Sequence, residues 1–262
     1  MLSLILLFSF IIGLEIGSFL NCVIYRLDKK ESPLQGRSFC PHCHHKLSWL
    51  DLIPVFSFFV LKGKCRYCHD KISWQYPLVE IATGFLFAFI IGQSSLALQS
   101  FFLIILSCFL IIIFVYDLKH YLIPDKVIYP AIIIGLVYQV FEVLKFGFNN
   151  LNFDSFLYAL FSAGLASAFF FSIFLISQGK WMGFGDVKLA FFLGLVLGWP
   201  NTFVAMFIAF LIGALIGTGL IALKRKTLKS EVPFAPFLII GTFIALFWGD
   251  KIIEWYTSFI LY

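Results

Sequence analysis

Two aspartates lie in apolar parts of the sequence, where an ionisable side chain is unfavourable and therefore indicates a specific role. Asp117 follows Phe114-Val115-Tyr116, and Asp186 closes the tetrapeptide Gly183-Phe184-Gly185-Asp186 before another apolar stretch. An acid at the centre of a membrane helix costs about 2.5–3.5 kcal/mol on insertion scales. Two carboxyl groups brought together cannot both ionise easily, so the pair can hold one proton. One member can then take a proton from water while the other polarises a peptide carbonyl, which is aspartic-protease chemistry.

The simpler alternative is that each aspartate only caps a helix end at the membrane surface, and the residues alone leave the two roles equally open. For Asp125, in Ile123-Pro124-Asp125, a turn or cap is the favoured role. Glu80 also lies beside an apolar stretch. It can hold a basic substrate segment or pair with a lysine, and the sequence does not decide between these.

Four of the six cysteines form two C-x-x-C pairs, Cys40 with Cys43 and, further along the chain, Cys65 with Cys68. The first pair opens Cys-x-x-Cys-His-x-Lys-Leu-Ser-Trp, and the second opens the same pattern with Ile for Leu. Such spacing suits four thiolates around one zinc ion, and the repeat predicts a pseudo-twofold ribbon. Disulfides, free thiols and an iron site are the alternatives, but disulfides do not persist on a reducing cytoplasmic face. A closed four-sulfur site leaves no position for substrate, so we expect a structural metal.

The overall composition indicates where these residues are held. Of 262 residues, 61% are hydrophobic and only 13% are charged, and the mean hydropathy is +0.98. A soluble domain has about half apolar and a quarter charged residues, so an ordinary cytosolic protein and a disordered chain are both excluded. The net charge of +5 is therefore interpreted as membrane topology, with the lipid bilayer as partner and no nucleic acid.

Cutting the apolar stretches at charges and turn residues predicts about eight transmembrane helices, near residues 2–25, 77–93, 97–116, 127–145, 155–177, 187–199, 201–223 and 234–249. The first lacks a basic start and an A-x-A-like cleavage site, so it is expected to be a retained helix. Three G-x-x-x-G pairs favour close helix packing within the chain over a dimer face; they are Gly13/Gly17, Gly194/Gly198 and Gly213/Gly217. The tail 251–262, with Trp255 and Tyr256, is expected at the outer interface.

The basic residues predict the orientation. With the polar region 26–76 in the cytoplasm, seventeen of the nineteen Lys and Arg lie on that side, and only Lys145 and Lys251 do not. Asp117 and Asp186 then fall on the same, cytoplasmic side. The stretch 187–199 spans only about 20 Å of a core about 30 Å thick, which puts Asp186 roughly 10 Å below the inner surface. An irregular backbone around a wet cavity is expected there, and Lys188 must extend to the surface or pair with a carboxylate.

These observations predict an all-α polytopic membrane protein with a small cytoplasmic zinc-ribbon-like domain. The predicted division is a first transmembrane helix (1–25), a cytoplasmic four-cysteine zinc-binding domain (26–76) and a membrane catalytic domain with about seven transmembrane helices (77–262).

Several motifs in order resemble one known family. They are Gly17-Ser18-Phe19-Leu20-Asn21 with Tyr25-Arg26-Leu27, the two C-x-x-C pairs, Tyr76-Pro77-x-x-Glu80, Asp117 with Ile123-Pro124-Asp125, and Gly-Phe-Gly-Asp-Val-Lys-Leu at 183–189. Over roughly residues 13–190 the chain resembles the bacterial type IV prepilin peptidases, membrane aspartic proteases of the G-x-G-D class. The combination is highly specific, whereas G-x-G-D alone would be weak evidence.

The resemblance implies an enzyme of the bacterial cytoplasmic (inner) membrane. Members of this family remove the basic leader from type IV prepilins or pseudopilins after a glycine, at the cytoplasmic face. Many also N-methylate the new N-terminus with S-adenosylmethionine. By position, Asp117 and Asp186 would be the catalytic pair, and the four cysteines would be the zinc ligands. The soluble loop contains no glycine-rich nucleotide-binding pattern, so the methylation expectation rests on the resemblance alone.

Two other functions compete at this point. The first is a proton-coupled carrier that uses the same two aspartates as relay groups, although the membrane half contains no convincing repeat. The second is a metal sensor or assembly scaffold in which the aspartates are structural. The sequence does not distinguish substrates that build a pilus, a secretion apparatus or a DNA-uptake fibre.

Overall fold

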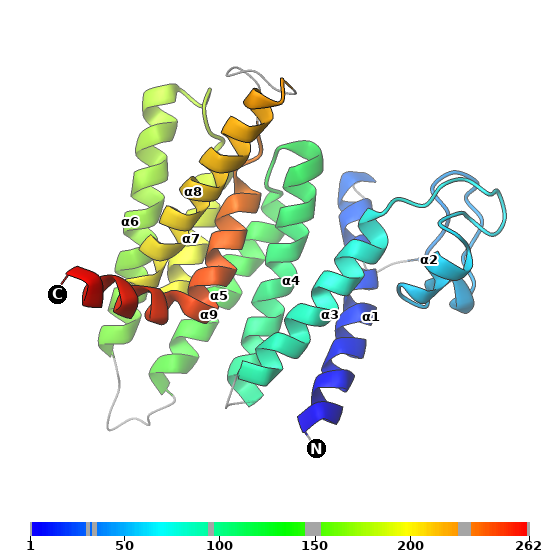
Figure 1. The fold of residues 1–262 in the computed structure, drawn as a ribbon, viewed down its shortest axis with the longest axis horizontal. Helices are drawn as coiled ribbons and strands as arrows, with labels where there is room; N and C mark the ends of the chain where they lie inside the picture. Colours follow the sequence, from blue (N-terminus) through cyan, green and yellow to red (C-terminus); the bar gives the residue numbers. More distant parts are fainter. Residues whose placement is uncertain are drawn as a thin grey trace. The chain divides into compact units, whose positions relative to one another are not determined.

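The computed structural model describes residues 2–29, 32, 36–93, 97–144, 153–224 and 232–260, and in these ranges it contains helices and no β-strand. Two isolated β-bridges are the extended pairings that we describe below. The predicted all-α class is confirmed. The helices are α1 (Leu2–Lys29), η1 (Trp49–Leu52), α2 (Phe56–Val60), α3 (Gln75–Gln93), α4 (Ala97–His120), α5 (Asp125–Leu144), α6 (Phe153–Ser177), α7 (Phe184–Leu197), α8 (Asn201–Ala222) and α9 (Ala235–Ile260) (Figure 1).

The chain divides into two compact units, Met1–Ile112 and Ile113–Tyr262. The first contains α1, η1, α2, α3 and the larger part of α4, and it includes all four paired cysteines. The second contains the end of α4 together with α5 to α9, and it includes both aspartates. The division predicted at residues 25 and 76 stays a prediction.

Among the described residues, seven helices are long and apolar enough to cross a membrane: α1, α3, α4, α5, α6, α8 and α9. The eighth predicted segment is α7, which has only 14 residues. At 1.5 Å per residue it is about 21 Å long, too short to cross a hydrocarbon core of about 30 Å by itself. The sequence already indicated a short helix here, and its length leaves one end of α7 below a membrane surface.

Helices α1 and α3 pack closely because small residues line their contact. A Cβ atom on Gly13 would lie 2.6 Å from Cα of Gly84, and one on Gly17 would lie 2.7 Å from Cα of Glu80. Near the same end, the buried Asn21 donates to the carbonyl oxygen of Tyr76 over 3.1 Å. The first G-x-x-x-G pair therefore serves packing inside the chain, as predicted.

In the second unit, Gly194 of α7 plays the same part against α6. A Cβ atom there would lie 2.4 Å from Cα of Ala163. The prediction does not extend to every glycine in the three pairs. Gly198 ends α7 with a positive φ of 65°, and Gly217 of α8 has nothing within 4 Å of its Cβ position.

This difference gives a stability prediction. Gly194→Ala is expected to destabilise the second unit by about 1–3 kcal/mol, because the methyl group would overlap a neighbouring backbone that can yield only by moving α6 from α7. Gly217→Ala is the matched control, since it adds the same methyl group in open space on a helix. Thermal unfolding of the purified protein in detergent measures both. Equal melting temperatures for the two variants would contradict the assignment.

The last helix bends. Figure 1 shows the final turns of α9, in red, running at a steep angle to its first turns, in orange. Trp255 and Tyr256 lie in these final turns and are exposed. Exposed Trp and Tyr are typical of the membrane–water interface. The arrangement agrees with the expectation of an interfacial tail, although residues 261 and 262 lie outside the described ranges.

Candidate active site and metal centre

The four paired cysteines come together in the first unit. Their sulfur atoms all lie within 4.8 Å of one another, and Sγ of Cys40 lies 3.8 Å from Sγ of Cys68. Four thiolates around zinc at about 2.3 Å would hold their sulfurs about 3.8 Å apart. The donor set therefore fits a tetrahedral ion such as zinc. Among the described residues, no histidine belongs to this cluster.

The two halves of the cluster are copies of one knuckle. In the first, the amide of Cys40 donates to the oxygen of His45, and the amide of His44 donates to Cys40. The same bonds recur in the second knuckle, from Cys65 to Asp70 and from His69 to Cys65. The β-bridges Phe39–Lys46 and Lys64–Lys71 keep the same offset, and both His44 and His69 have a positive φ. The predicted repeat is confirmed, and these two histidines make the knuckle turns.

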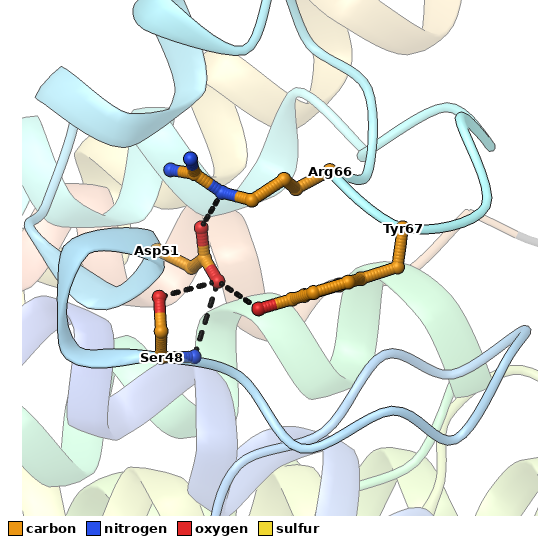
Figure 2. Close-up of polar contacts among 4 residues, drawn as sticks. All are labelled: Ser48, Asp51, Arg66 and Tyr67. Atoms are coloured by element: carbon orange, nitrogen blue, oxygen red, sulfur yellow. Dashed lines mark hydrogen bonds and ion pairs between the residues drawn. The ribbon is translucent and has the colours of Figure 1, made fainter.

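Asp51 ties the two knuckles together (Figure 2). Its Oδ2 accepts from the amide and hydroxyl of Ser48, at 3.1 and 2.8 Å, and from the hydroxyl of Tyr67. Its Oδ1 accepts from Nε of Arg66 at 2.7 Å. Burial by itself would raise the pKa of Asp51, but the bonds from Arg66 and Ser48 hold this pKa below its ordinary value. Arg66 and Tyr67 are the two residues between Cys65 and Cys68, so Asp51 orients the second knuckle directly.

Asp70 makes a weaker link in the same module. Its carboxylate lies 2.9 Å from Nδ1 of His42, and both side chains are at least half exposed. The acids of this polar segment that could attract a basic leader are Asp28, Glu31, Asp51 and Asp70. Since Asp51 and Asp70 carry contacts inside the module, they are poor candidates for that task. Glu31 lies outside the described residues.

The difference in burial predicts different effects on stability. Asp51→Asn is expected to destabilise the cysteine module by about 2 kcal/mol, because a buried carboxylate loses its charge and one of its two acceptor oxygens. Asp70→Asn is the matched control and should cost at most ~1 kcal/mol, since exposed pairs contribute little. The rate at which a chelator removes the metal from each purified variant measures the effect. If both variants release metal at the wild-type rate, Asp51 does not hold the module.

Glu80 makes its contacts with backbone and hydroxyl groups of the first unit. Its Oε2 accepts from the backbone amide of Val55 over 2.7 Å, and its carboxylate also accepts from the hydroxyl of Ser18. The side chain is buried, with 6% exposed. Glu80 therefore anchors the loop before α2 to the α1–α3 pair, and no lysine takes part in the contacts described for it. The hydropathy pattern carried no signal for this contact.

Asp117 occupies the end of α4 in the second unit. Only 5% of the residue is exposed, and its Oδ2 is buried with no hydrogen-bond partner among the described residues. The carboxylate accepts one bond, from the backbone amide of Ala235, the first residue of α9. A buried oxygen without a hydrogen-bond partner lowers the stability of the fold, which indicates that Asp117 does more than cap a helix.

Asp186 is the third residue of α7 and is half-buried. Its carboxylate accepts from the backbone amide of Gly183 and interacts electrostatically with that of Asp117. The two predicted site residues are thus neighbours, brought together from α4 and α7. The expected irregular backbone is shorter than predicted. Helix α7 already begins at Phe184, and Gly183 has an ordinary φ of −77°.

The G-x-G-D segment is held against the Ile-Pro-Asp segment that precedes α5. A Cβ atom on Gly185 would lie 3.0 Å from Cβ of Ile123, so the second glycine of the motif permits a close approach. Just after Asp186 in the chain, Nζ of Lys188 lies 2.6 Å from Oδ1 of Asp125 and above the ring of Tyr129. Of the two expectations for Lys188, pairing with a carboxylate is confirmed. For Asp125, an ion pair adds to its position in the first turn of α5.

This arrangement can perform acid–base chemistry. Two carboxylates that interact electrostatically do not both ionise easily, so an arrangement of this kind can hold one proton between the two groups. Each carboxylate is oriented by a backbone amide at the N-terminus of a helix, α7 or α9. The sequence did not predict that α9 contributes to this site. Pro236 signals a helix start, but nothing in the pattern indicates that this start meets Asp117.

The comparisons with known proteins agree with the geometry. The bacterial peptidase A24 N-terminal domain matches residues 11–93, and the type IV leader peptidase family matches residues 104–218. The chain is similar to the prepilin leader peptidase/N-methyltransferase of Aeromonas salmonicida, with 33% identity over 99% of this chain and 94% of that protein. It is also similar to the proteins of that name from Pseudomonas aeruginosa (31%, over 96% and 93%) and Bacillus subtilis (33%, over 96% and 98%).

No solved structure matches. The seven apolar helices and these bacterial relatives make the protein a multi-pass bacterial membrane protein. No comparison favours a carrier. The identity over nearly the whole length of several relatives, together with the two matching domains, settles the family. The chain belongs to the type IV leader peptidase family.

Proposed function

We propose that this protein is an aspartic endopeptidase that removes the leader peptide from type IV prepilins or pseudopilins, with Asp117 and Asp186 as its catalytic pair. The observation that carries the proposal is the buried, unpartnered Oδ2 of Asp117 beside a second carboxylate from another helix. The names of the relatives, prepilin leader peptidase/N-methyltransferase, supply the substrate class.

The chemistry follows from one proton shared by two carboxyl groups. The ionised aspartate takes a proton from a water molecule, and the oxygen of that water bonds to the scissile carbonyl carbon. The protonated aspartate donates to the carbonyl oxygen as its double bond opens. The tetrahedral diol then collapses: one hydroxyl group returns its proton to the pair as the carbonyl re-forms, the C–N bond breaks, and a proton from the pair passes to the leaving amine. The pair ends with one proton, ready for a new cycle.

The backbone around the pair prepares it for this reaction. The amides of Gly183 and Ala235 each donate to one carboxylate, so both side chains are oriented before substrate binds. Helix N-termini also favour negative charge, which supports the ionised form of whichever aspartate has lost the proton. The second oxygen of Asp117 stays available for water or for the substrate carbonyl.

The proposed location is the cytoplasmic (inner) membrane, with the active site open to the cytoplasm. The skew of seventeen of nineteen Lys and Arg to one side supports this orientation. The same side would carry the cysteine module and the α4 and α7 ends that bear the aspartates. A prepilin would therefore present its leader from the cytoplasm.

We also propose that zinc occupies the cysteine cluster and acts as a structural ion. Four thiolates fill a tetrahedral shell, so no coordination position remains for water or substrate. The ion would hold the two knuckles in the orientation that Asp51 reinforces.

N-methylation of the new N-terminus is the second activity that we propose, on the names of the relatives. S-adenosylmethionine would supply the methyl group. The described residues offer no glycine-rich nucleotide-binding turn, and no step is assigned to particular side chains.

The test is direct. Purified protein in detergent is mixed with a purified prepilin and methyl-labelled S-adenosylmethionine, and the products are measured by mass. We expect loss of the leader after a glycine, with the label on the new N-terminal residue. An intact prepilin after incubation with zinc-loaded protein would overturn the proposal, whereas cleavage without label would remove only the methylation part.

A further inference from the structure

The short helix α2 exposes an apolar face. Phe56, Phe59 and Val60 have the i, i+3, i+4 spacing of one helix face, and 62%, 58% and 57% of each residue is exposed. Trp74, directly before α3, is 62% exposed. We call these four residues the α2 face. A set of exposed apolar side chains on one face indicates an interaction surface.

The first depth marker is Trp74. Helix α3 has 19 residues and spans about 28 Å, close to the thickness of the hydrocarbon core, so its first residue lies near a membrane surface. The ring of Trp74 lies 4.8 Å from that of the buried Phe58 and 6.5 Å from that of Phe59. These contacts hold α2 at the level where α3 enters the membrane.

The second depth marker is Glu80. Its Oε2 binds the amide of Val55, the residue directly before α2. Counted from Gln75, the first residue of α3, Glu80 lies about 7.5 Å along the helix. The start of α2 is therefore level with the second turn of a spanning helix. Figure 1 shows α2 beside the first turns of α3 and not beyond the end of that helix.

We propose that the α2 face is a membrane-interface element, inserted among the headgroups and upper acyl chains of the leaflet at which α3 begins. Two markers, Trp74 directly before α3 and Glu80 within it, set its depth, and aromatic side chains are the type that this region prefers. The exposed Lys62 and Lys64 follow α2 directly and suit the phosphates of anionic lipids. The partner is thus a lipid surface, and the contact fixes the height of the cysteine module above the membrane.

The experiment measures depth in the full-length protein. A nitroxide is attached to p-acetylphenylalanine in place of Phe56, Phe59 or Lys71, which leaves all six cysteines unmodified. Lys71 is the control, because it is exposed on the second knuckle. The labelled proteins are reconstituted in nanodiscs of phosphatidylethanolamine and phosphatidylglycerol. Collision rates with oxygen and with a water-soluble nickel chelate are then compared, and one zinc per chain confirms that each module is folded.

The ratio of oxygen to nickel accessibility at positions 56 and 59 is expected to exceed that at position 71 by at least about threefold. Equal ratios at the three positions would show that the face lies in water and would overturn the proposal. Shielding of positions 56 and 59 from both reagents would show that protein covers the face, and would overturn it equally. The measurement does not depend on cleavage, so it stands apart from the proposed peptidase activity.

Discussion

Replacement of either Asp117 or Asp186 by asparagine is expected to abolish leader removal, with a loss of at least about 10³-fold in the cleavage rate. General acid–base catalysis alone contributes about 10²–10⁴-fold, and each asparagine leaves the other aspartate with no partner for its proton. Asparagine preserves the shape of the side chain, so the loss measures proton transfer rather than packing. The measurement is the initial rate of prepilin cleavage by purified protein in detergent.

The matched control is Asp154→Asn, the same chemical change at an exposed acid in the first turn of α6. It should cleave at the wild-type rate. All three variants should also retain wild-type metal content, because the cysteine cluster belongs to the other unit. Cleavage that survives both Asp117→Asn and Asp186→Asn would rule out the proposed mechanism.

A stability measurement separates catalysis from helix capping. If Asp117 only capped α9, Asp117→Asn should lower the melting temperature. A functional carboxylate with a buried, unpartnered oxygen costs stability instead, so its replacement should leave the melting temperature unchanged or raise it. Loss of activity together with undiminished stability is the expected combination. A fall in both would favour the structural role.

Cys40→Ser is expected to remove the metal and unfold the cysteine module. Apparent binding free energies for structural zinc are about 10–16 kcal/mol in small zinc domains, so a segment with so few buried apolar residues depends on its ion. We expect about one zinc per chain in the wild type and close to none in the variant. Elemental analysis gives the content, and hydrogen exchange over residues 36–74 reports the unfolding.

Cys108→Ser provides the control, since Cys108 lies in α4 and outside the cluster. It should keep the full metal content and the protection of the module. Iron in place of zinc would correct the identity of the ion and leave the structural role intact. A Cys40→Ser variant with wild-type metal content and exchange rates would disprove that role.

The helices and the knuckles were predicted well because both follow from local pattern. Apolar runs of about 20 residues have few alternatives to a membrane helix, and the described helices lie within about four residues of the predicted spans, except at the end of α9. The knuckle repeat was equally local, and the structure repeats its hydrogen bonds with the same offset as the sequence. The largest shift is at the end of α9, which continues to Ile260 instead of residue 249. Helix α7 starts at Phe184 instead of residue 187, and this smaller shift brings Asp186 into its first turn.

Contacts between distant residues could not be predicted in this way. The carboxylate of Glu80 meets the backbone amide of Val55, far earlier in the chain, and Asp51 meets Arg66 in the opposite knuckle. Lysine partners or substrate contacts were the natural expectations for such acids, because sequence shows charge but not the backbone that approaches it. The contact of Lys188 was the exception. A lysine below the membrane surface either extends its amine to that surface or pairs with a carboxylate, and the second of these predictions is confirmed.

The amino-acid order by itself determined the membrane character, the set of apolar helices and the residue types that can hold a metal or share a proton. These are properties of composition and spacing, and they survive any rearrangement of the helices. Only the tertiary structure decided that Asp117 and Asp186 are neighbours, that one carboxylate oxygen is buried without a partner, and that the start of α9 reaches Asp117. Such facts depend on how helices pack, which is set by many weak contacts such as that of Gly194 with Ala163 and not by any motif.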